Sequence, residues 1–504
     1  MAWPFSFGVL LGLGQGQPVW WLQLLAMLVL AGQLDSCRIW QRAAWLGGLF
    51  ATAMLCATFW WLYISMHVYG GLAAPLTVLA VVALAALLAL YYAAAAGLFV
   101  LLAPGRRAPR ALVFAALWLL AELARVKLFT GFPWGEGGYA HVDGWARPLA
   151  AWVGVHGLTF GAAFLAALAA LSLRAAKVAW LTALGVGALS MGLAWVPVPE
   201  LADTPQAPAL SVTLLQGNIP QSEKFIPGTG VVEALRWYGE QLRDAKTSLV
   251  VAPETALPLL PQDLPGGYWQ ALQGRFAGGQ QAALIGIPLG SYDTGYTNSV
   301  VGLKSGQSEP YRYNKHHLVP FGEFIPTGFH WFTQLMNIPL GDFNRGEVAQ
   351  ASFDWQGQRL ALNICYEDLF GEDLGARFID PALAPTIFVN LSNIGWFGNT
   401  VAIDQHLQIS RMRALEFGRP MIRATNTGAT VIIDHRGQVT HALERHTRGA
   451  LVGEVYGQGA GDTASGVAGL RITPYAWWVS RYGLWPLWAG CLAIVGLALG
   501  LRRR

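Results

Sequence analysis

The acidic residues of this chain are gathered in one stretch. All but four of its 29 aspartates and glutamates lie between Pro197 and Ser480, in a chain of 504 residues. Only 12% of the residues are charged and 54% are hydrophobic, whereas an ordinary soluble domain is about 25% charged. The sequence therefore predicts an apolar, membrane-resident part joined to a water-soluble part. The net charge of +4 is too small to indicate nucleic-acid binding.

The apolar part contains several runs close to the roughly 18 to 20 residues that cross a bilayer. They cover residues 18–34, 43–65, 73–103, 110–127, 147–173, 178–196 and 483–501. A shorter run over 5–14 completes a count of about eight spans. We thus expect a multi-pass transmembrane bundle of seven spans (1–196), a soluble domain (197–480), and a C-terminal transmembrane helix with a basic tail (481–504).

The distribution of basic residues predicts how these spans are oriented. Lys or Arg occurs in the connections at 35–42, 104–110 and 174–177 and in the tail at 502–504. The connections at 66–72 and 128–146 contain neither. Because basic loops stay in the cytoplasm, both termini are predicted to be cytoplasmic and the soluble domain extracytoplasmic.

Three charged residues lie within or beside one apolar run, namely Glu122, Arg125 and Lys127. Ionisable groups at such depth are costly and often functional, but Glu122 and Arg125 could equally form an i,i+3 pair that lets one helix tolerate its own charges. The aromatic loop that follows offers Phe132 and Trp134 as candidate lipid-contacting residues at an interfacial turn. The halves show no internal repeat, which argues against a secondary transporter.

The soluble part consists of short apolar segments bounded by turn residues. Segments 211–215, 248–252, 359–364 and 385–389 read as strands, and helical stretches such as 405–417 lie between them. Continuous apolar strands separated by helices indicate strands that are buried on both faces. The sequence therefore predicts an α/β layered sandwich.

Three side chains of this domain could carry chemistry together. Glu254 and Cys365 come directly after buried apolar segments, and Lys315 lies between them in the chain. A thiol is nucleophilic only as the thiolate, so it needs a base such as a carboxylate, and acyl transfer also needs a cation to hold the oxyanion. Taken singly each signal is weak, since a lone buried Cys is more often a core residue and a Glu–Lys pair is usually a salt bridge.

No metal or cofactor is expected. The four cysteines are too few and too scattered for a disulfide framework or a thiolate cage. His316 and His317 are adjacent, so their side chains are expected to point to different faces, and no further ligand has suitable spacing.

The order Glu, Lys, Cys resembles the triad of the nitrilase superfamily of carbon–nitrogen hydrolases. The strings that carry this resemblance are Pro253-Glu254-Thr255, Asn314-Lys315-His316 and Cys365-Tyr366-Glu367. Fusion to a membrane bundle narrows the likeness to the bacterial apolipoprotein N-acyltransferases. That likeness extends over 215–221, 315–326, 405–408, 411–416, 423–428 and the membrane loop 131–134.

The resemblance implies an αββα sandwich and a two-step acyl transfer. Cys365 would take an acyl chain from a phospholipid, with phosphatidylethanolamine as the expected donor, and pass it to the N-terminal amine of a diacylglyceryl-cysteine apolipoprotein. Glu254 would act as the base, and Lys315 with the backbone N–H of Tyr366 would hold the oxyanion. The resemblance also implies a bacterial inner membrane, with the soluble domain in the periplasm. The sequence carries no signal for the oligomeric state, and a monomer is the default expectation.

Further residues are carried over as supporting or lipid-contacting. Glu323 would orient Lys315, and Glu367 would support the cysteine loop unless it simply pairs with a nearby arginine. The candidate lipid-contacting residues are Phe132, Trp134, Phe225, Trp396 and Phe397. The chain departs from the family pattern at Ile394-Gly395, where Asp-Ala is usual, and at Phe225, where Trp is expected.

Two other functions remain open. One is a membrane-tethered nitrilase-type amidase that passes the acyl group to water. The other is a transporter or sensor whose soluble part only binds a ligand, in which case replacing Cys365 would leave function intact. A bundle of many spans argues against a simple tether, which would need only one.

Overall fold

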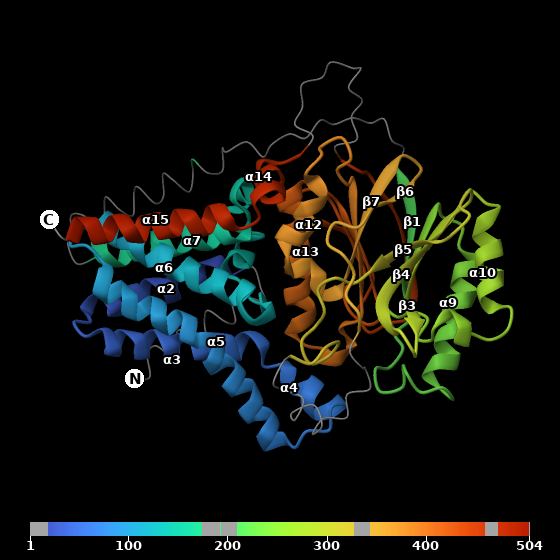
Figure 1. The fold of residues 1–504 in the computed structure, drawn as a ribbon, viewed down its shortest axis with the longest axis horizontal. Coiled ribbons are helices and arrows are strands. Elements are labelled where there is room, and N and C mark those ends of the chain that lie inside the picture. Colours follow the sequence, from blue (N-terminus) through green and yellow to red (C-terminus); the bar gives the residue numbers. More distant parts are fainter. Residues whose placement is uncertain (1–18, 174–191, 193–208, 327–342, 459–471, 503–504) are drawn as a thin grey trace, which may run out of the picture. The chain divides into compact units, whose positions relative to one another are not determined.

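The computed structural model describes residues 19–173, 192, 209–326, 343–458 and 472–502. The chain divides into two compact units (Figure 1). The helical unit comprises Met1–Tyr63, Ala73–Pro199 and Tyr482–Arg504. The sheet unit comprises Ile64–Leu72 and Glu200–Arg481.

The helical unit consists of long helices joined by short turns. Its helices are α2 (Trp20–Ser36), α3 (Trp40–Phe59), α5 (Ala74–Leu102), α6 (Arg107–Lys127), α7 (Ala150–Ser172) and α15 (Trp485–Arg502), with the 3-10 turns η2 (Leu128–Thr130), η3 (Gly137–His141) and η4 (Arg147–Leu149). Each long helix coincides with one of the predicted apolar runs. The predicted runs at 5–14 and 178–196 lie outside the described residues.

Several of these helices are long and apolar enough to cross a membrane. They are Trp40–Phe59, Ala74–Leu102 and Arg147–Ser172, and the bent pair Pro474–Tyr482 and Trp485–Gly500 adds a fourth if it counts as one span. Helix α2 falls short with 17 residues, and α6 carries several charged residues. The described part therefore shows a membrane protein with three or four candidate spans, and the count of eight stays a prediction.

Glu122 and Arg125 on α6 each bind the segment that follows this helix. Arg125 donates to the backbone carbonyl oxygens of Phe132 and Trp134, both at 2.7 Å. Glu122 accepts the backbone N–H of Gly137 at 3.0 Å. Both side chains are buried and hold the loop, and the charges of Glu122 and Arg125 also attract each other.

The buried Glu122 carboxylate predicts a large loss of stability on replacement. It also lies 2.8 Å from Nδ1 of His156 and accepts the hydroxyl of Thr159 at 3.2 Å. Glu122→Leu would leave the N–H of Gly137, the ring of His156 and the hydroxyl of Thr159 without their acceptor. Each buried group left unpaired lowers the free energy of unfolding by about 1–3 kcal/mol. We expect the melting temperature in detergent, measured by scanning fluorimetry, to fall by several degrees. Lys127→Gln, at an exposed position of the same helix, should leave it unchanged, and an unchanged value for Glu122→Leu would contradict this role.

The sheet unit contains two six-stranded mixed sheets. One has the strand order β12-β1-β2-β3-β4-β5 and the other β11-β10-β9-β8-β7-β6. The strands are β1 (Leu210–Gln216), β2 (Leu249–Ala252), β3 (Ala282–Ser291), β4 (Gly295–Leu303), β5 (Tyr311–Asn314), β6 (Phe353–Trp355), β7 (Gln358–Ile364), β8 (Ile387–Ser392), β9 (Met421–Thr425), β10 (Val431–Ile433), β11 (Val439–Ala442) and β12 (Gly449–Val455). The central strands β1 to β3 and β7 to β9 pair in parallel, and the outer ones in antiparallel.

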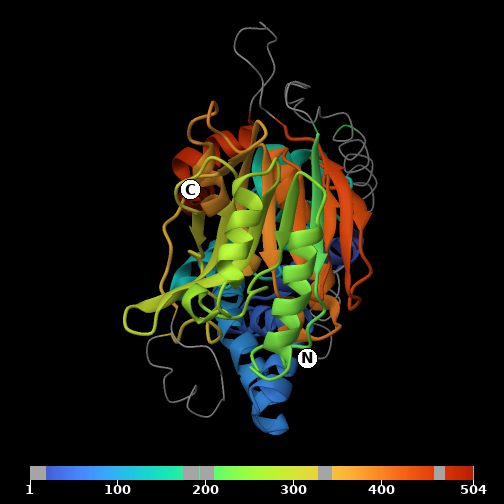
Figure 2. The same ribbon diagram turned by 90° about the vertical axis from the view of Figure 1, so that its right-hand side faces the viewer.

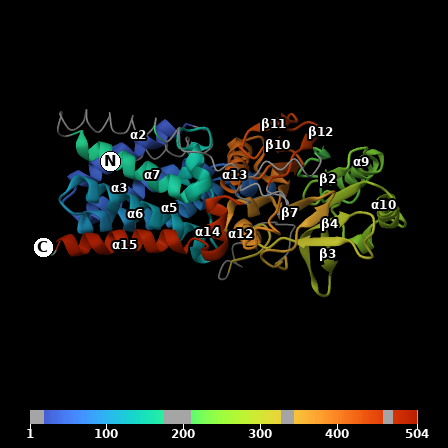
Figure 3. The same ribbon diagram turned by 90° about the horizontal axis from the view of Figure 1, so that it is seen from above.

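Helices cover the outer face of each sheet. They are α9 (Gly230–Asp244), α10 (Tyr268–Ala277), α12 (Gly371–Gly375), α13 (Val401–Phe417) and α14 (Pro474–Tyr482). The unit also holds the short turns η1 (Ser65–Tyr69), η5 (Pro261–Asp263), η6 (Cys365–Leu369), η7 (Ala376–Phe378) and η8 (Ile394–Phe397), and α4 (Leu62–Ile64) stands in the chain where the helical unit passes into η1. Helices α9 and α10 lie in front of the first sheet (Figure 2). Helices α13 and α14 pack on the second sheet (Figure 3).

The two sheets pack face to face through apolar side chains. Val212, Val251, Leu362 and Val389 are fully buried in this layer. Strand β2 is buried along its whole length, as expected for a strand with neighbours on both faces. The sheet unit therefore has the layered α/β architecture that the strand and helix pattern predicts.

Candidate active site

The candidate catalytic residues stand where strands of the two sheets end. Glu254 follows β2, Lys315 follows β5 and Cys365 follows β7. Cys365 has a φ of +50° and Thr255, next to Glu254, has a φ of +45°. L-residues adopt this left-handed conformation only where their surroundings hold it. The backbone thus turns sharply at two of the three positions.

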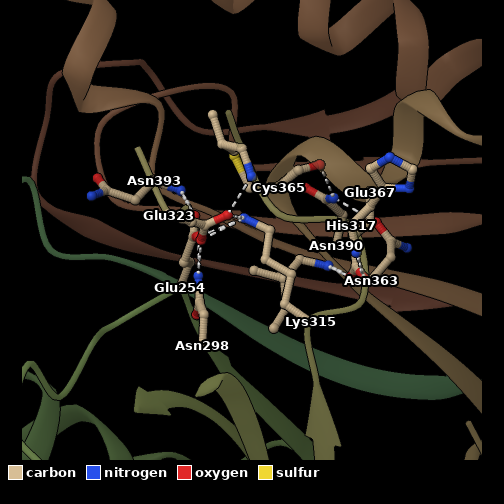
Figure 4. A network of polar contacts seen from close by, with 12 residues as sticks. Glu254, Asn298, Lys315, His317, Glu323, Asn363, Cys365, Glu367, Asn390 and Asn393 are labelled. Carbon is tan, nitrogen blue, oxygen red and sulfur yellow. Dashed lines mark hydrogen bonds and ion pairs between the residues drawn. The ribbon is translucent and has the colours of Figure 1, made fainter. Parts of the chain in front are cut away.

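Lys315 lies between two carboxylates (Figure 4). Its Nζ is 3.3 Å from Oε1 of Glu254 and 2.8 Å from Oε2 of Glu323. Asn298 of β4 donates through Nδ2 to both carboxylates, at 2.7 and 2.6 Å. The structure thus brings together three residues that were singled out from the sequence.

The cluster is buried and sets one ammonium against two carboxylates. Burial alone would lower the pKa of Lys315, but the carboxylates of Glu323 and Glu254 outweigh it and raise that pKa above its ordinary value. Lys315 therefore stays an ammonium. The second oxygen of Glu254 accepts the backbone N–H of Asn393 at 2.8 Å, so both oxygens of this carboxylate are held in place.

Cys365 lies beside this cluster and keeps part of its surface exposed (Figure 4). Burial and the Glu254 carboxylate raise the pKa of its thiol to about 12, against a smaller opposing effect of Lys315. The resting nucleophile is therefore a thiol at neutral pH. Because the thiolate is the reactive form, the thiol needs a proton acceptor, and of the neighbouring acids Glu254 acts on it most strongly.

Glu367 ties the strand before Lys315 to the turn of the nucleophile. One of its oxygens accepts the Tyr313 hydroxyl and the backbone N–H of Ile364, both at 2.7 Å. The other accepts the backbone N–H of His316 at 2.6 Å. Among the described residues no arginine pairs with this carboxylate, so its contacts favour the supporting role over the simple ion pair.

Three residues of the site were not singled out from the sequence, namely Asn298, Asn393 and Lys224. Asn298 is a polar residue of β4 that is 4% exposed, and Asn393 follows β8, so the strand pattern and the strand-end position could have indicated both. Lys224 is 2% exposed and donates to the backbone carbonyl of Glu254 at 3.0 Å. The sequence contains no signal for its burial, because it lies among exposed residues of a turn.

Lys224 gives the protein a specific pH dependence. Burial lowers the pKa of its ammonium to about 8, only partly offset by Glu254 and Cys365. The unfolded chain therefore binds more protons between pH 8 and the ordinary value of 10.5, and stability rises as the pH increases through this window. Lys224→Met should abolish that rise, which amounts to roughly 3 kcal/mol. The measurement is the melting temperature of the wild type and of Lys224→Met from about pH 7 to 10. A difference in melting temperature that stays constant over this range would contradict the lowered pKa of Lys224.

The turn η8 carries aromatic candidates for lipid contact. Trp396 is half-buried and meets Tyr69 edge to face, with ring centroids 5.7 Å apart. The segment Ile64–Leu72, which the sequence places between two spans, therefore packs against this turn. The departure Ile394-Gly395 is buried within the same turn.

The other candidate lipid-contacting residues differ in exposure. Phe132, Phe225 and Phe397 are half-buried. Trp134 is 4% exposed and packs on Trp61, with ring centroids 4.8 Å apart. Trp134 therefore offers little surface to a lipid in this conformation.

His316, His317 and Asp373 come together, with possible ligand atoms all within 4.8 Å of one another. No acid stands at ligand spacing from the two histidines in the sequence, and the fold brings Asp373 to them from a distant part of the chain. His316 Nδ1 lies 2.7 Å from the carbonyl oxygen of Gly346, and His317 Nδ1 lies 3.0 Å from the Asp373 carboxylate. Protein partners thus satisfy both Nδ1 atoms.

The fold and the site define a class of protein. Residues 211–464 match the family described as carbon–nitrogen hydrolase, and this stretch holds both mixed sheets and the carboxylate–lysine–cysteine cluster. The sheet unit is therefore a carbon–nitrogen hydrolase domain. Residues 7–168 match the apolipoprotein N-acyltransferase N-terminal domain.

Curated relatives match the chain over nearly its whole length. It is 62% identical to the apolipoprotein N-acyltransferase of Verminephrobacter eiseniae (strain EF01-2), over 96% of this chain and 94% of that one. The corresponding protein of Ralstonia nicotianae is 44% identical, over 96% and 90%, and that of Bordetella bronchiseptica 41%, over 97% and 94%. The chain belongs to the apolipoprotein N-acyltransferase family.

Proposed function

We propose that this protein moves a fatty acyl chain from a phospholipid to the N-terminal amine of a diacylglyceryl-cysteine apolipoprotein. The observation that carries the proposal is the partly exposed Cys365 thiol beside the buried cluster of Glu254, Lys315 and Glu323. The names of its full-length relatives support the same activity.

Cys365 is the nucleophile of the first half-reaction. Glu254 accepts the Sγ proton while the sulfur attacks the ester carbonyl carbon of the phospholipid, with phosphatidylethanolamine as the expected donor. The Lys315 ammonium and the backbone N–H of Tyr366 stabilise the oxyanion. The bond between the carbonyl carbon and the glycerol oxygen then breaks, and that oxygen takes the proton from Glu254 and leaves as lysophospholipid.

The acceptor amine completes the reaction. It attacks the thioester carbonyl carbon while Glu254 accepts an amine proton. The carbon–sulfur bond breaks, the sulfur regains the proton, and the product is an amide on a free enzyme. Neither half-reaction needs a further reactant, because Glu254 returns each proton that it accepts to the leaving oxygen or sulfur. Glu323 and Glu367 act by holding Lys315 and the turn of Cys365.

Each part of the chain has a proposed location relative to the membrane. Residues 1–196 and 481–504 hold the protein in a bacterial inner membrane, with both termini cytoplasmic. Residues 197–480 form the catalytic domain in the periplasm, where the acceptor lipoproteins are. The basic residues of the predicted cytoplasmic connections support this orientation.

The test is intact-protein mass spectrometry after incubation of the detergent-purified protein with phosphatidylethanolamine. We expect a mass increase of one acyl chain that hydroxylamine removes, together with released lysophospholipid. Added diacylated lipopeptide should discharge the adduct and gain the chain. Discharge by water at the same rate would favour the amidase alternative. A folded protein that forms no adduct and releases no lysophospholipid would overturn the proposal and favour a transporter or sensor.

A further inference from the structure

The backbone carbonyl of Cys365 is held by two side chains from neighbouring elements. Asn390 of β8 donates to it through Nδ2 at 3.3 Å (Figure 4), and Nε2 of His406 on α13 lies 3.2 Å away. Both side chains are fully buried. Cys365 lies beyond Ile364, the last residue of β7 that pairs with β8. At Cys365, where the backbone turns, the side chains of Asn390 and His406 therefore bind the carbonyl in place of the hydrogen bond that a neighbouring strand would supply.

The contacts of His406 define its tautomer. Arg423 of β9 places Nη2 3.1 Å from Nδ1 of His406. A guanidinium can only donate, so Nδ1 is the acceptor and the ring proton sits on Nε2. That N–H faces both the carbonyl of Cys365 and Oδ1 of Asp368, the latter at 2.9 Å. His406 is thus a donor to the backbone of the nucleophile.

Asp368 and Ser410 complete this network. Asp368 lies in the same turn as Cys365, η6, and its second oxygen accepts the hydroxyl of Ser410 at 2.5 Å. Arg423 also donates to the backbone carbonyl of His406, at 2.9 Å. Asp368, His406, Ser410 and Arg423 are at most 1% exposed, and one carboxylate balances one guanidinium. The network is therefore buried, and its side chains offer almost no surface to a substrate.

We propose that Asp368, His406 and Arg423 are positioning residues that hold Cys365 in the conformation from which its thiol attacks. The inference rests on the proposed function of Cys365 as the acyl nucleophile. Without the His406 donor the carbonyl of Cys365 keeps only its contact with Asn390, so the left-handed turn is held less firmly and the sulfur is displaced. A displacement of about 1 Å can lower a rate about 100-fold. We expect donor binding to be unaffected, because the side chains of the network are buried.

The test compares two replacements of His406 in the full-length protein. Leu removes the donor, whereas the amide of Gln reaches the place of Nε2 and restores it. Thioester formation is followed by mass spectrometry over a series of phosphatidylethanolamine concentrations. We expect His406→Leu to be acylated about 100-fold more slowly with an unchanged half-saturating concentration, and His406→Gln to stay within about tenfold of the wild type. Asp368→Asn should fall between them and serves if His406→Leu does not fold.

The matched control is Glu416→Gln on the same helix. Glu416 is fully buried and pairs with Arg413 at 2.8 Å, outside the network. Its replacement should lower the melting temperature and leave the acylation rate within about twofold. Equal rates for the wild type and His406→Leu would overturn the inference, and so would equal losses in the Leu and Gln variants, which would show a merely structural role. If the wild type forms no thioester, the proposed function itself fails.

Discussion

Cys365→Ala is expected to abolish both half-reactions. The substitution removes the sulfur and leaves the Glu254–Lys315–Glu323 cluster intact. Loss of the nucleophile in covalent catalysis costs about 10⁴-fold or more in rate. Incubation with phosphatidylethanolamine should therefore give no acyl adduct, no lysophospholipid and no triacylated lipopeptide, all measured by mass spectrometry.

The controls for this prediction distinguish loss of the Cys365 thiol from the general effect of replacing a cysteine. Cys56→Ala removes a half-buried cysteine of the helical unit and should keep the adduct. Cys365→Ser keeps a weak oxygen nucleophile, so any adduct it forms should be an ester that forms far more slowly. A hydroxylamine-sensitive adduct that persists at wild-type levels in Cys365→Ala would show that another thiol carries the acyl group.

Glu254→Gln is expected to change rate and thiol ionisation in opposite directions. Loss of the base should slow thioester formation about 10²- to 10⁴-fold. The carboxylate of Glu254 raises the pKa of the Cys365 thiol, so its removal lowers that pKa and increases the thiolate fraction at a given pH. Iodoacetamide, which reacts with the thiolate, should therefore alkylate Cys365 with a midpoint at lower pH than in the wild type.

Two variants sharpen this prediction. Glu323→Gln removes the acid with the weaker effect on the thiol, so its shift of the alkylation midpoint should be smaller. Glu309→Gln, at an exposed position, should change neither quantity. A slow Glu254→Gln whose alkylation midpoint does not move would contradict the place of Glu254 beside the thiol, and an undiminished rate would contradict its role as base.

The sequence by itself determined that the chain has a membrane part and a soluble part, and which type of chemistry the site supports. Charged residues are costly in a bilayer, so the crowding of acids between Pro197 and Ser480 already separates a membrane part from a soluble part. Periodicity predicted strands at 211–215, which lies within β1, and at 248–252, which begins one residue before β2 and ends with it. It also placed Glu254 and Cys365 at strand ends, because the change from an apolar run to polar residues marks the point where a buried strand leaves the core.

Only the tertiary structure decided which polar groups meet. Asn298, Lys224 and His406 reach the site from β4, a surface turn and α13, far apart in the chain. In the helical unit, Glu122 accepts the backbone N–H of Gly137, a contact that its helical spacing did not indicate. Local patterns report whether a residue is buried, since burial follows the period of a helix or strand. The partner of a buried polar group depends instead on sheet order and on how separate elements pack, and a single sequence does not encode these in any local period.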